Sequence, residues 1–278
     1  MTLFSLSSKS TLSKSGSDSH SHHHRHSSSS SSSSSNNNNN NNNRNFDDFV
    51  PTATLQVQAI GYDVDQALTG RTLENISVFR SGSKDPEYVS IRLKKNSNSC
   101  ALVRASDQAT LISTIYRFGP GRHPRMRLLN LDFKVSVEDA IKNEKVQGEL
   151  IEVKSRSMVS RAQVFDTSLG KFKWRYGTNA EKAACNADSL LVMERLDRAS
   201  VPGGGCVAQL IRNDQYRTPG SKVYSGGNGG CLFIDLRMWN EDKHTSPQRV
   251  EAFVVASCIL MLKREADRFI DNHLALVV

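Results

Sequence analysis

Residues 252–262 read AFVVASCILML, and this stretch decides how the chain folds. A helix that is apolar on every side must be enclosed on every side. Thr245, Ser246, Pro247 and Gln248 predict its start, because a hydroxyl can accept a backbone N–H, Gln248 can complete a capping box and proline suits the first turn. At about 1.5 Å per residue the run covers roughly 16 Å, about half of a bilayer's hydrocarbon core. The stretch therefore predicts a helix sheathed by protein, and no transmembrane span.

Upstream of this helix, from residue 54 to residue 239, apolar and polar residues alternate with short breaks, which is the period of β-strands. The breaks carry turn residues, as in GGNGG at 226–230. Segments 136–145 and 178–187 interrupt the pattern and predict single helical turns or ordered loops. In the last strand, 232–238, we expect Asp235 to point outward into solvent.

Many antiparallel strands with one polar face each need something apolar to cover the other face. Two packed sheets are one solution, and a closed barrel with a plug is another. The apolar helix follows the final strand directly, and closure removes exposed strand edges. We therefore expect a mainly β (α+β) fold, a closed antiparallel β-barrel of about ten to twelve strands around a buried C-terminal hydrophobic helix.

The N-terminal part of the chain has a different composition. Residues 7–44 are Ser, His and Asn with scattered charges, and such a tract buries too little to offset its ordering entropy. We expect a disordered, low-complexity tail over residues 1–50 and the barrel domain over residues 51–278. The N-terminus lacks the apolar core of a signal peptide, whereas a Ser-rich mitochondrial transit peptide stays open.

The chain holds five cysteines, and they form no C-x-x-C pair. Cys258 lies inside the apolar helix, where we expect it to act as a small hydrophobe. This usage fits a reducing, intracellular compartment. We expect a cytoplasmic protein. A peripheral position at the inner face of a membrane is compatible with this expectation.

The order of elements resembles a known family. A Phe-x-Trp strand at 172–174 is followed by strands at 190–194 and 207–212, a Gly-broken strand at 231–238 and a Val-rich helix at 250–269. This order resembles the tubby C-terminal-like domain superfamily, whose fold phospholipid scramblases and LURP-one-related proteins share. The resemblance covers roughly residues 54–272. It implies a closed barrel around the C-terminal helix and suggests phosphoinositide binding by surface cations, but no motif here matches the lipid-binding residues of tubby.

Two basic clusters are the candidate sites for an anionic lipid. In KFKWRY at 171–176, period 2 places Lys171, Lys173 and Arg175 on one face and three aromatics on the other. Such a strip can bind phosphorylated headgroups, or it can simply keep the barrel's outside soluble. Arg125 and Arg127 share a face and form a possible fork for phosphate, with loop solvation as the alternative.

The net charge of +8 is compatible with an anionic partner without requiring one. The sequence holds no P-loop, dinucleotide fingerprint or G-x-S-x-G elbow, so we expect no enzyme and no cofactor. We expect no metal site, because the histidines at 20–26 have no fixed geometry and His123, His244 and His273 are too few and too scattered. A nucleic-acid partner is not expected, because the aromatics at 172–176 should face inward. The leading hypothesis is a peripheral module that binds anionic phospholipid, a phosphoinositide in particular. The alternative is a protein-interaction or scaffold module regulated by its tail.

Overall fold

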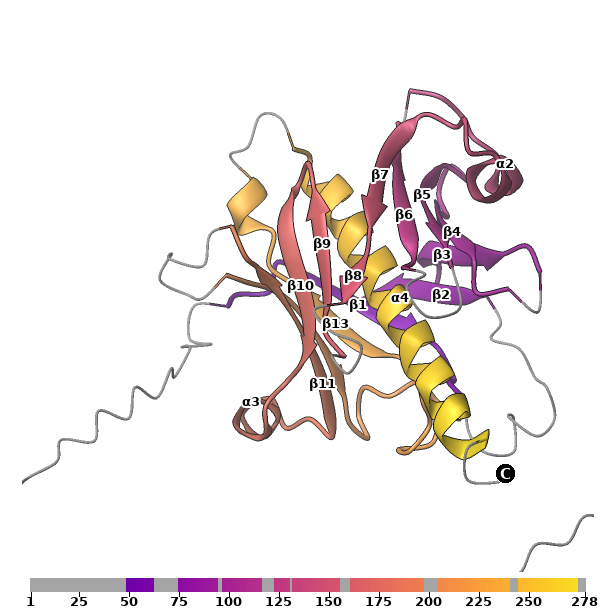
Figure 1. Cartoon of the computed structure of the whole chain (residues 1–278). Coiled ribbons are helices and arrows are strands. Elements are labelled where there is room, and N and C mark those ends of the chain that lie inside the picture. The colour runs from indigo at the N-terminus through magenta and orange to yellow at the C-terminus, as the bar shows by residue number, and fades with distance from the viewer. Residues whose placement is uncertain are drawn as a thin grey trace, which may run out of the picture. The chain divides into compact units, whose positions relative to one another are not determined.

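The computed structural model describes residues 49–62, 75–94, 97–116, 123–130, 132–155, 161–197, 205–240 and 245–274. The tail expected over residues 1–50 lies outside these ranges except for its last two residues. Within them the chain is mainly β, and its strands form one antiparallel sheet that curls around a long C-terminal helix (Figure 1). The expected fold class is confirmed.

The sheet has thirteen strands in the described residues, slightly more than the ten to twelve expected. They are β1 (Ala53–Gln58), β2 (Ile76–Arg80), β3 (Pro86–Arg92), β4 (Cys100–Arg104), β5 (Thr110–Ile115), β6 (Arg125–Leu129), β7 (Gly148–Glu152), β8 (Lys154–Ser155), β9 (Gln163–Thr167), β10 (Gly170–Tyr176), β11 (Ser189–Arg195), β12 (Cys206–Arg212) and β13 (Gly230–Ile234). Their order is β7-β6-β5-β4-β3-β2-β1-β13-β12-β11-β10-β9-β8. Neighbours in the sheet are therefore consecutive in the chain except where β1 meets β13.

The barrel nearly closes where β7 passes into β8. A single residue, Val153, separates the two strands, and its side chain is fully buried. β7 pairs with β6, whereas β8 pairs with β9 from the other end of the strand order. The Ser168 backbone N–H, in the turn after β9, donates to Glu149 Oε1 of β7 at 2.6 Å. One nearly continuous strand thus changes partners at Val153 and joins the two edges of the sheet.

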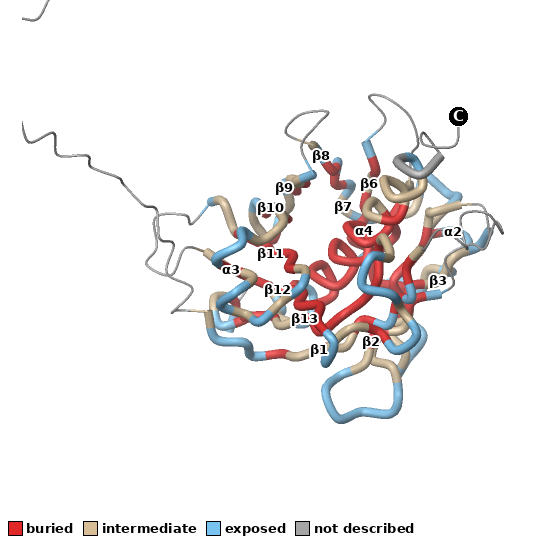
Figure 2. Tube along the Cα trace, turned by 90° about the horizontal axis from the view of Figure 1, so that it is seen from below, coloured by how far each residue is buried: buried red, intermediate tan, exposed pale blue. Residues whose placement is uncertain are grey.

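Helix α4 (Pro247–Leu274) fills the barrel. Every residue from 250 to 263 is buried, including Val254, Val255 and Ile259, which are at most 1% exposed. Figure 2 shows this buried part of the helix inside the ring of strands. The expectation of a sheathed helix is confirmed. Among the described residues, no helix combines the length and the apolarity that crossing a membrane requires.

The start of α4 lies where the sequence predicted it, but its cap has a different form. The Ser246 carbonyl accepts the backbone N–H of Arg249 at 3.0 Å. The Ser246 hydroxyl, which was expected to accept a backbone N–H, donates instead to the side-chain oxygen of Gln248. Ser246 therefore serves the first turn through its backbone, while its side chain fixes Gln248.

The aromatic face of β10 packs against α4, as the alternation predicted. Phe172 and Trp174 are fully buried. Phe172 lies 5.4 Å from the ring of Phe253 on the helix, centroid to centroid. The Trp174 indole N–H donates to the Ser257 hydroxyl at 2.9 Å. This hydrogen bond satisfies the polar residue in the middle of the apolar run and fixes the rotation of the helix against the strand.

The last strand differs from the prediction. β13 ends at Ile234, and a short 3-10 helix, η2 (Arg237–Trp239), follows. Asp235 is 5% exposed, accepts the backbone N–H of Arg237 at 3.1 Å and pairs with the Arg237 guanidinium at 2.6 Å. The expectation of a solvated Asp235 is therefore wrong. Its side chain makes an Asx-type turn, and this turn ends the strand.

Candidate functional site

The predicted cationic strip on β10 is largely neutralised. Lys173 Nζ lies 3.0 Å from Glu194 Oε2, and Arg175 Nε lies 2.8 Å from Glu194 Oε1. Arg175 also holds both oxygens of Glu181, at 2.6 and 2.7 Å. Burial by itself would raise the pKa of Glu194, but the hydrogen bonds from Arg175 and Lys173 outweigh it and hold that pKa below its usual range. Of the strip, only Lys171 is exposed and has no carboxylate partner among the described residues.

Glu181 comes from α3 (Asn179–Ala184), one of two short helices that stand where the sequence predicted helical turns. The Thr178 hydroxyl and the Glu181 carboxylate form a full capping box at its N-terminus. This box fixes Glu181 over Arg175.

The second predicted cluster forms no fork. Arg127 is 5% exposed, and its guanidinium donates to the carbonyls of Asn143 and Glu144 at 2.9 and 3.2 Å, at the C-terminal end of α2 (Val137–Lys142). Arg125 pairs with Glu152 at 3.5 Å. Arg127 therefore holds a helix end, where a cation is favourable, and Arg125 faces a carboxylate.

Strand β7 separates the two predicted clusters. Its Glu149 bonds Ser168 in the turn that leads to Lys171, and its Glu152 pairs with Arg125. Two carboxylates thus lie between the clusters, and the structure does not bring the five cations together. Their role in lipid binding stays a prediction.

A different part of the molecule combines cations with exposed apolar side chains. We call it the exit end, the end of the barrel where the C-terminal turns of α4 emerge. The turn between β3 and β4 reaches it through Asn98, whose side chain donates to Asp267 at 3.0 Å. The loop before β13 also reaches it, because a Cβ built on Gly227 would lie 2.3 Å from the Leu262 carbonyl oxygen. Gly227 has φ +79°, so this part of the GGNGG run is needed for close approach to the helix as well as for turning.

Charged side chains line the inside of this end. Arg212 is buried and holds both oxygens of Glu265 on α4, at 2.6 and 2.9 Å. The Tyr116 hydroxyl donates to Asp267, and Lys263 Nζ donates to the Asn98 carbonyl at 3.0 Å. These bonds fix the emerging helix to both halves of the barrel.

The rim of the exit end combines apolar and basic side chains with the exposed carboxylate of Asp271 on α4. The segments that reach this end carry four of the seven exposed large apolar side chains of the described residues: Ile60 (51%), two residues before the Tyr62–Gly226 bridge, Leu93 (38%) at the turn after β3, and Val223 (61%) and Tyr224 (67%) in the loop before β13. Lys94 adjoins Leu93, Lys222 lies over the Tyr224 ring at 5.9 Å, and Arg264 is on α4.

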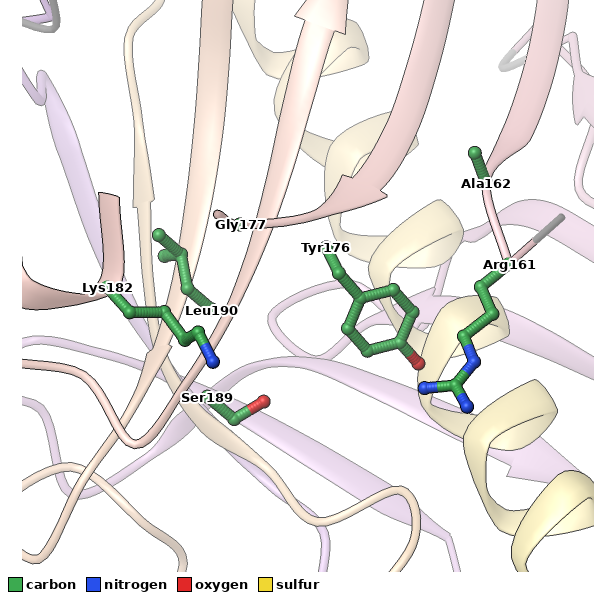
Figure 3. Close-up of a pocket in the computed structure, with 7 residues that line it drawn as sticks. All are labelled: Arg161, Ala162, Tyr176, Gly177, Lys182, Ser189 and Leu190. Atoms are coloured by element: carbon green, nitrogen blue, oxygen red, sulfur yellow. The ribbon is translucent and has the colours of Figure 1, made fainter. Parts of the chain in front are cut away.

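Beside the exit end lies a pocket of about 410 Å³, which we call the side pocket (Figure 3). Its lining comes from the two residues before β9, the end of β10 and the residue after it, α3 and the start of β11: Arg161, Ala162, Tyr176, Gly177, Lys182, Ser189 and Leu190. The Tyr176 hydroxyl accepts from Arg268 of α4 at 3.1 Å, and the Arg161 guanidinium lies 5.8 Å from the Tyr176 ring centroid. Burial, with the nearby Glu265 carboxylate, raises the pKa of Tyr176, so its hydroxyl stays protonated.

Sequence reasoning named Tyr176 only as part of the β10 strip and missed the other residues of the side pocket. They are spread over residues 161–190 with no motif spacing, so no local signal marks them. Within the described residues, no group of three His, Cys, Asp or Glu side chains is placed to hold a metal ion. Comparisons with family models, curated proteins and solved structures find no match to this chain.

Proposed function

We propose that this protein is a non-catalytic module that docks on anionic phospholipid with its exit end against the membrane. The observation that carries the proposal is that the segments bearing the exposed Val223–Tyr224 pair, Lys94, Lys222 and Arg264 converge at the exit end. Apolar tips next to cations suit an interface where headgroups are negative and acyl chains lie just beneath. The proposed place is the inner face of a membrane, where anionic lipids concentrate.

The turn that bears Val223 and Tyr224 is held in shape before binding. The Ser225 backbone N–H donates to the Lys222 carbonyl at 3.1 Å, and the Asn228 side chain donates to the same carbonyl at 3.1 Å. A turn that is already ordered loses little conformational entropy when it enters the interface.

The expected affinity is modest. A cation near an anionic surface contributes at most about 1 kcal/mol, so the three cations together contribute at most about 3 kcal/mol. Val223 and Tyr224 add about 1 to 2 kcal/mol each, since roughly a third of each is already covered. Together these correspond to a dissociation constant of roughly 10 to 200 µM, which suits reversible, peripheral docking.

Sedimentation with liposomes tests the proposal. The Val223→Ser/Tyr224→Ser variant should bind anionic vesicles at least about thirtyfold more weakly than the wild type, which corresponds to a loss of at least about 2 kcal/mol. Phe133→Ser is the matched control, because Phe133 is similarly exposed (63%) in the loop before α2. Unchanged pelleting of the double variant, or equal pelleting on neutral and anionic vesicles, would contradict the proposal.

The same assay distinguishes lipid binding by the predicted β10 strip from lipid binding by the exit end. A Lys171→Ala/Lys173→Ala/Arg175→Ala variant should pellet nearly as well as the wild type, because two of its three cations already pair with Glu194 and Glu181. A selective loss in this variant would move the docking surface to β10.

We also propose that the chain is a distant member of the tubby-like superfamily. The antiparallel barrel around a buried C-terminal helix supports this, since it is the architecture that the resemblance implies. The lack of catalysis is proposed on a related ground: α4 fills the barrel interior and leaves little room there for a substrate. A solved structure in which α4 lies outside the ring of strands would contradict the family proposal.

A further inference from the structure

We infer that the side pocket binds a small soluble organic phosphate that carries a second acidic group. This inference is independent of membrane docking, because none of the side-pocket residues belongs to the apolar rim. It rests on the hydrogen-bonding character, the charge and the shape of the pocket.

The first step is that the pocket offers donors. Lys182 and Arg161 have no carboxylate partner among the residues that the structure describes. The Ser189 oxygen accepts from Arg212 Nη2 at 2.7 Å, so its own hydrogen remains available to the pocket. A ligand that satisfies these groups must be rich in acceptors, as phosphate and carboxylate are.

The second step is that nearby carboxylates do not cancel this charge. Glu181 is held by Arg175 and Glu265 by Arg212, each through two hydrogen bonds. Asp188, next to Ser189, pairs with Arg217. Each acid therefore neutralises an arginine outside the pocket lining, and the positive charges of Lys182 and Arg161 stay available to a ligand.

The third step concerns shape. Figure 3 shows the Lys182 amine and the Ser189 hydroxyl on one side of Tyr176, and the Arg161 guanidinium on the other side, near the Tyr176 hydroxyl. A ligand that meets both sides needs an anionic group at each end. The lining between them is apolar, from Leu190, Gly177 and the Tyr176 ring, so the middle of the ligand should be flat or apolar. A volume of about 410 Å³ accommodates a molecule the size of a phosphorylated aromatic amino acid.

Isothermal titration calorimetry on the full chain tests the proposed ligand class with three probes that differ in their acidic groups. Free O-phosphotyrosine carries a phosphate, a ring, a carboxylate and an α-ammonium group; phenyl phosphate lacks the carboxylate and the ammonium group, and tyrosine lacks the phosphate. We expect O-phosphotyrosine to bind about tenfold more tightly than phenyl phosphate, and tyrosine to show no binding. Equal affinity for all three, or no heat with O-phosphotyrosine, would overturn the inference.

Two variants assign the two ends of the ligand, with the phosphate placed at the two donors Lys182 and Ser189 and the carboxylate at Arg161, and a third variant is the control. Lys182→Gln should weaken both phosphate probes about tenfold, whereas Arg161→Gln should weaken O-phosphotyrosine and leave phenyl phosphate unchanged. Lys171→Gln is the matched control, since Lys171 is an exposed lysine on the same strand as Tyr176 but at its other end. Full binding by the Lys182 and Arg161 variants would place the ligand elsewhere.

A lipid headgroup shares the phosphate chemistry, and liposome sedimentation separates the two sources. Lys182→Gln should pellet with phosphoinositide vesicles as the wild type does while losing O-phosphotyrosine binding. Loss of pelleting in Lys182→Gln would instead place a headgroup in the pocket and overturn the assignment to a soluble ligand. Failure of membrane docking itself would appear in the Val223→Ser/Tyr224→Ser variant, so the two proposals fail separately.

Discussion

Replacing Ser257 with alanine removes one oxygen from the middle of α4 and should destabilise the fold. Ser257 is fully buried, and its hydroxyl accepts the Trp174 indole N–H at 2.9 Å while donating to the Val254 carbonyl at 3.0 Å. Alanine leaves the indole N–H buried without a partner, which costs about 1 to 3 kcal/mol. In a domain of this size a cost of 2 kcal/mol lowers the melting temperature by roughly 4 to 8 °C.

Urea unfolding followed by circular dichroism measures this cost. The decisive quantity is the coupling with Trp174→Phe, which removes the donor: Ser257→Ala should cost about 1 to 2 kcal/mol less in that background. Cys258→Ala is the control, because Cys258 is equally buried on the next position of the helix and should show no coupling with Trp174→Phe. Additive free energies for Ser257→Ala and Trp174→Phe would refute the placement of α4 against β10.

Two further predictions concern the exit end. Glu265→Gln leaves the buried Arg212 without its counter-charge and should cost about 3 to 5 kcal/mol, measured as the free energy of unfolding. Burial alone would raise the pKa of Glu265, but the Arg212 guanidinium outweighs it and holds that pKa below its unfolded value of about 4.3. The Arg212–Glu265 pair therefore stabilises the fold above that pH, and this stabilisation is lost as pH falls through the folded pKa of Glu265. If the free energies of unfolding of the wild type and of Glu265→Gln fell in parallel on acidification, this pH dependence would be contradicted. Gly227→Ala should lower the melting temperature more than Gly82→Ala does. Both glycines have φ near +80°, but only a Cβ on residue 227 would lie 2.3 Å from the Leu262 carbonyl oxygen. Equal melting temperatures for the two variants would contradict the close contact.

The side pocket shows where sequence reasoning stops. Lys182 and Ser189 lie outside any alternating pattern that marks a strand face, and Arg161 precedes its strand. Nothing local connects them, because their proximity depends on how β9, β10, α3 and β11 pack. The exit end is similar: its apolar tips come from three separate turns, and single exposed apolar residues in turns carry no signal of their own.

The β10 strip shows a finer limit. Alternation correctly placed Phe172 and Trp174 inside and the cations outside. Whether those cations are available depended on the strand register, which sets Lys173 opposite Glu194, and on the capping box that brings Glu181 to Arg175. A register is a property of two strands together, so one strand's pattern cannot reveal it.

The sequence by itself determined that the helix is enclosed and that the enclosing elements are β-strands, because apolar surface must leave water and each period fits one backbone geometry. Tertiary structure alone decided the near-closure of the sheet at Val153, the neutralisation of Lys173 and Arg175, and the convergence of donors in the side pocket. The physical reason is that hydrophobic burial is encoded residue by residue along the chain, whereas ion pairs and pockets depend on distances between residues that only the packed fold brings together.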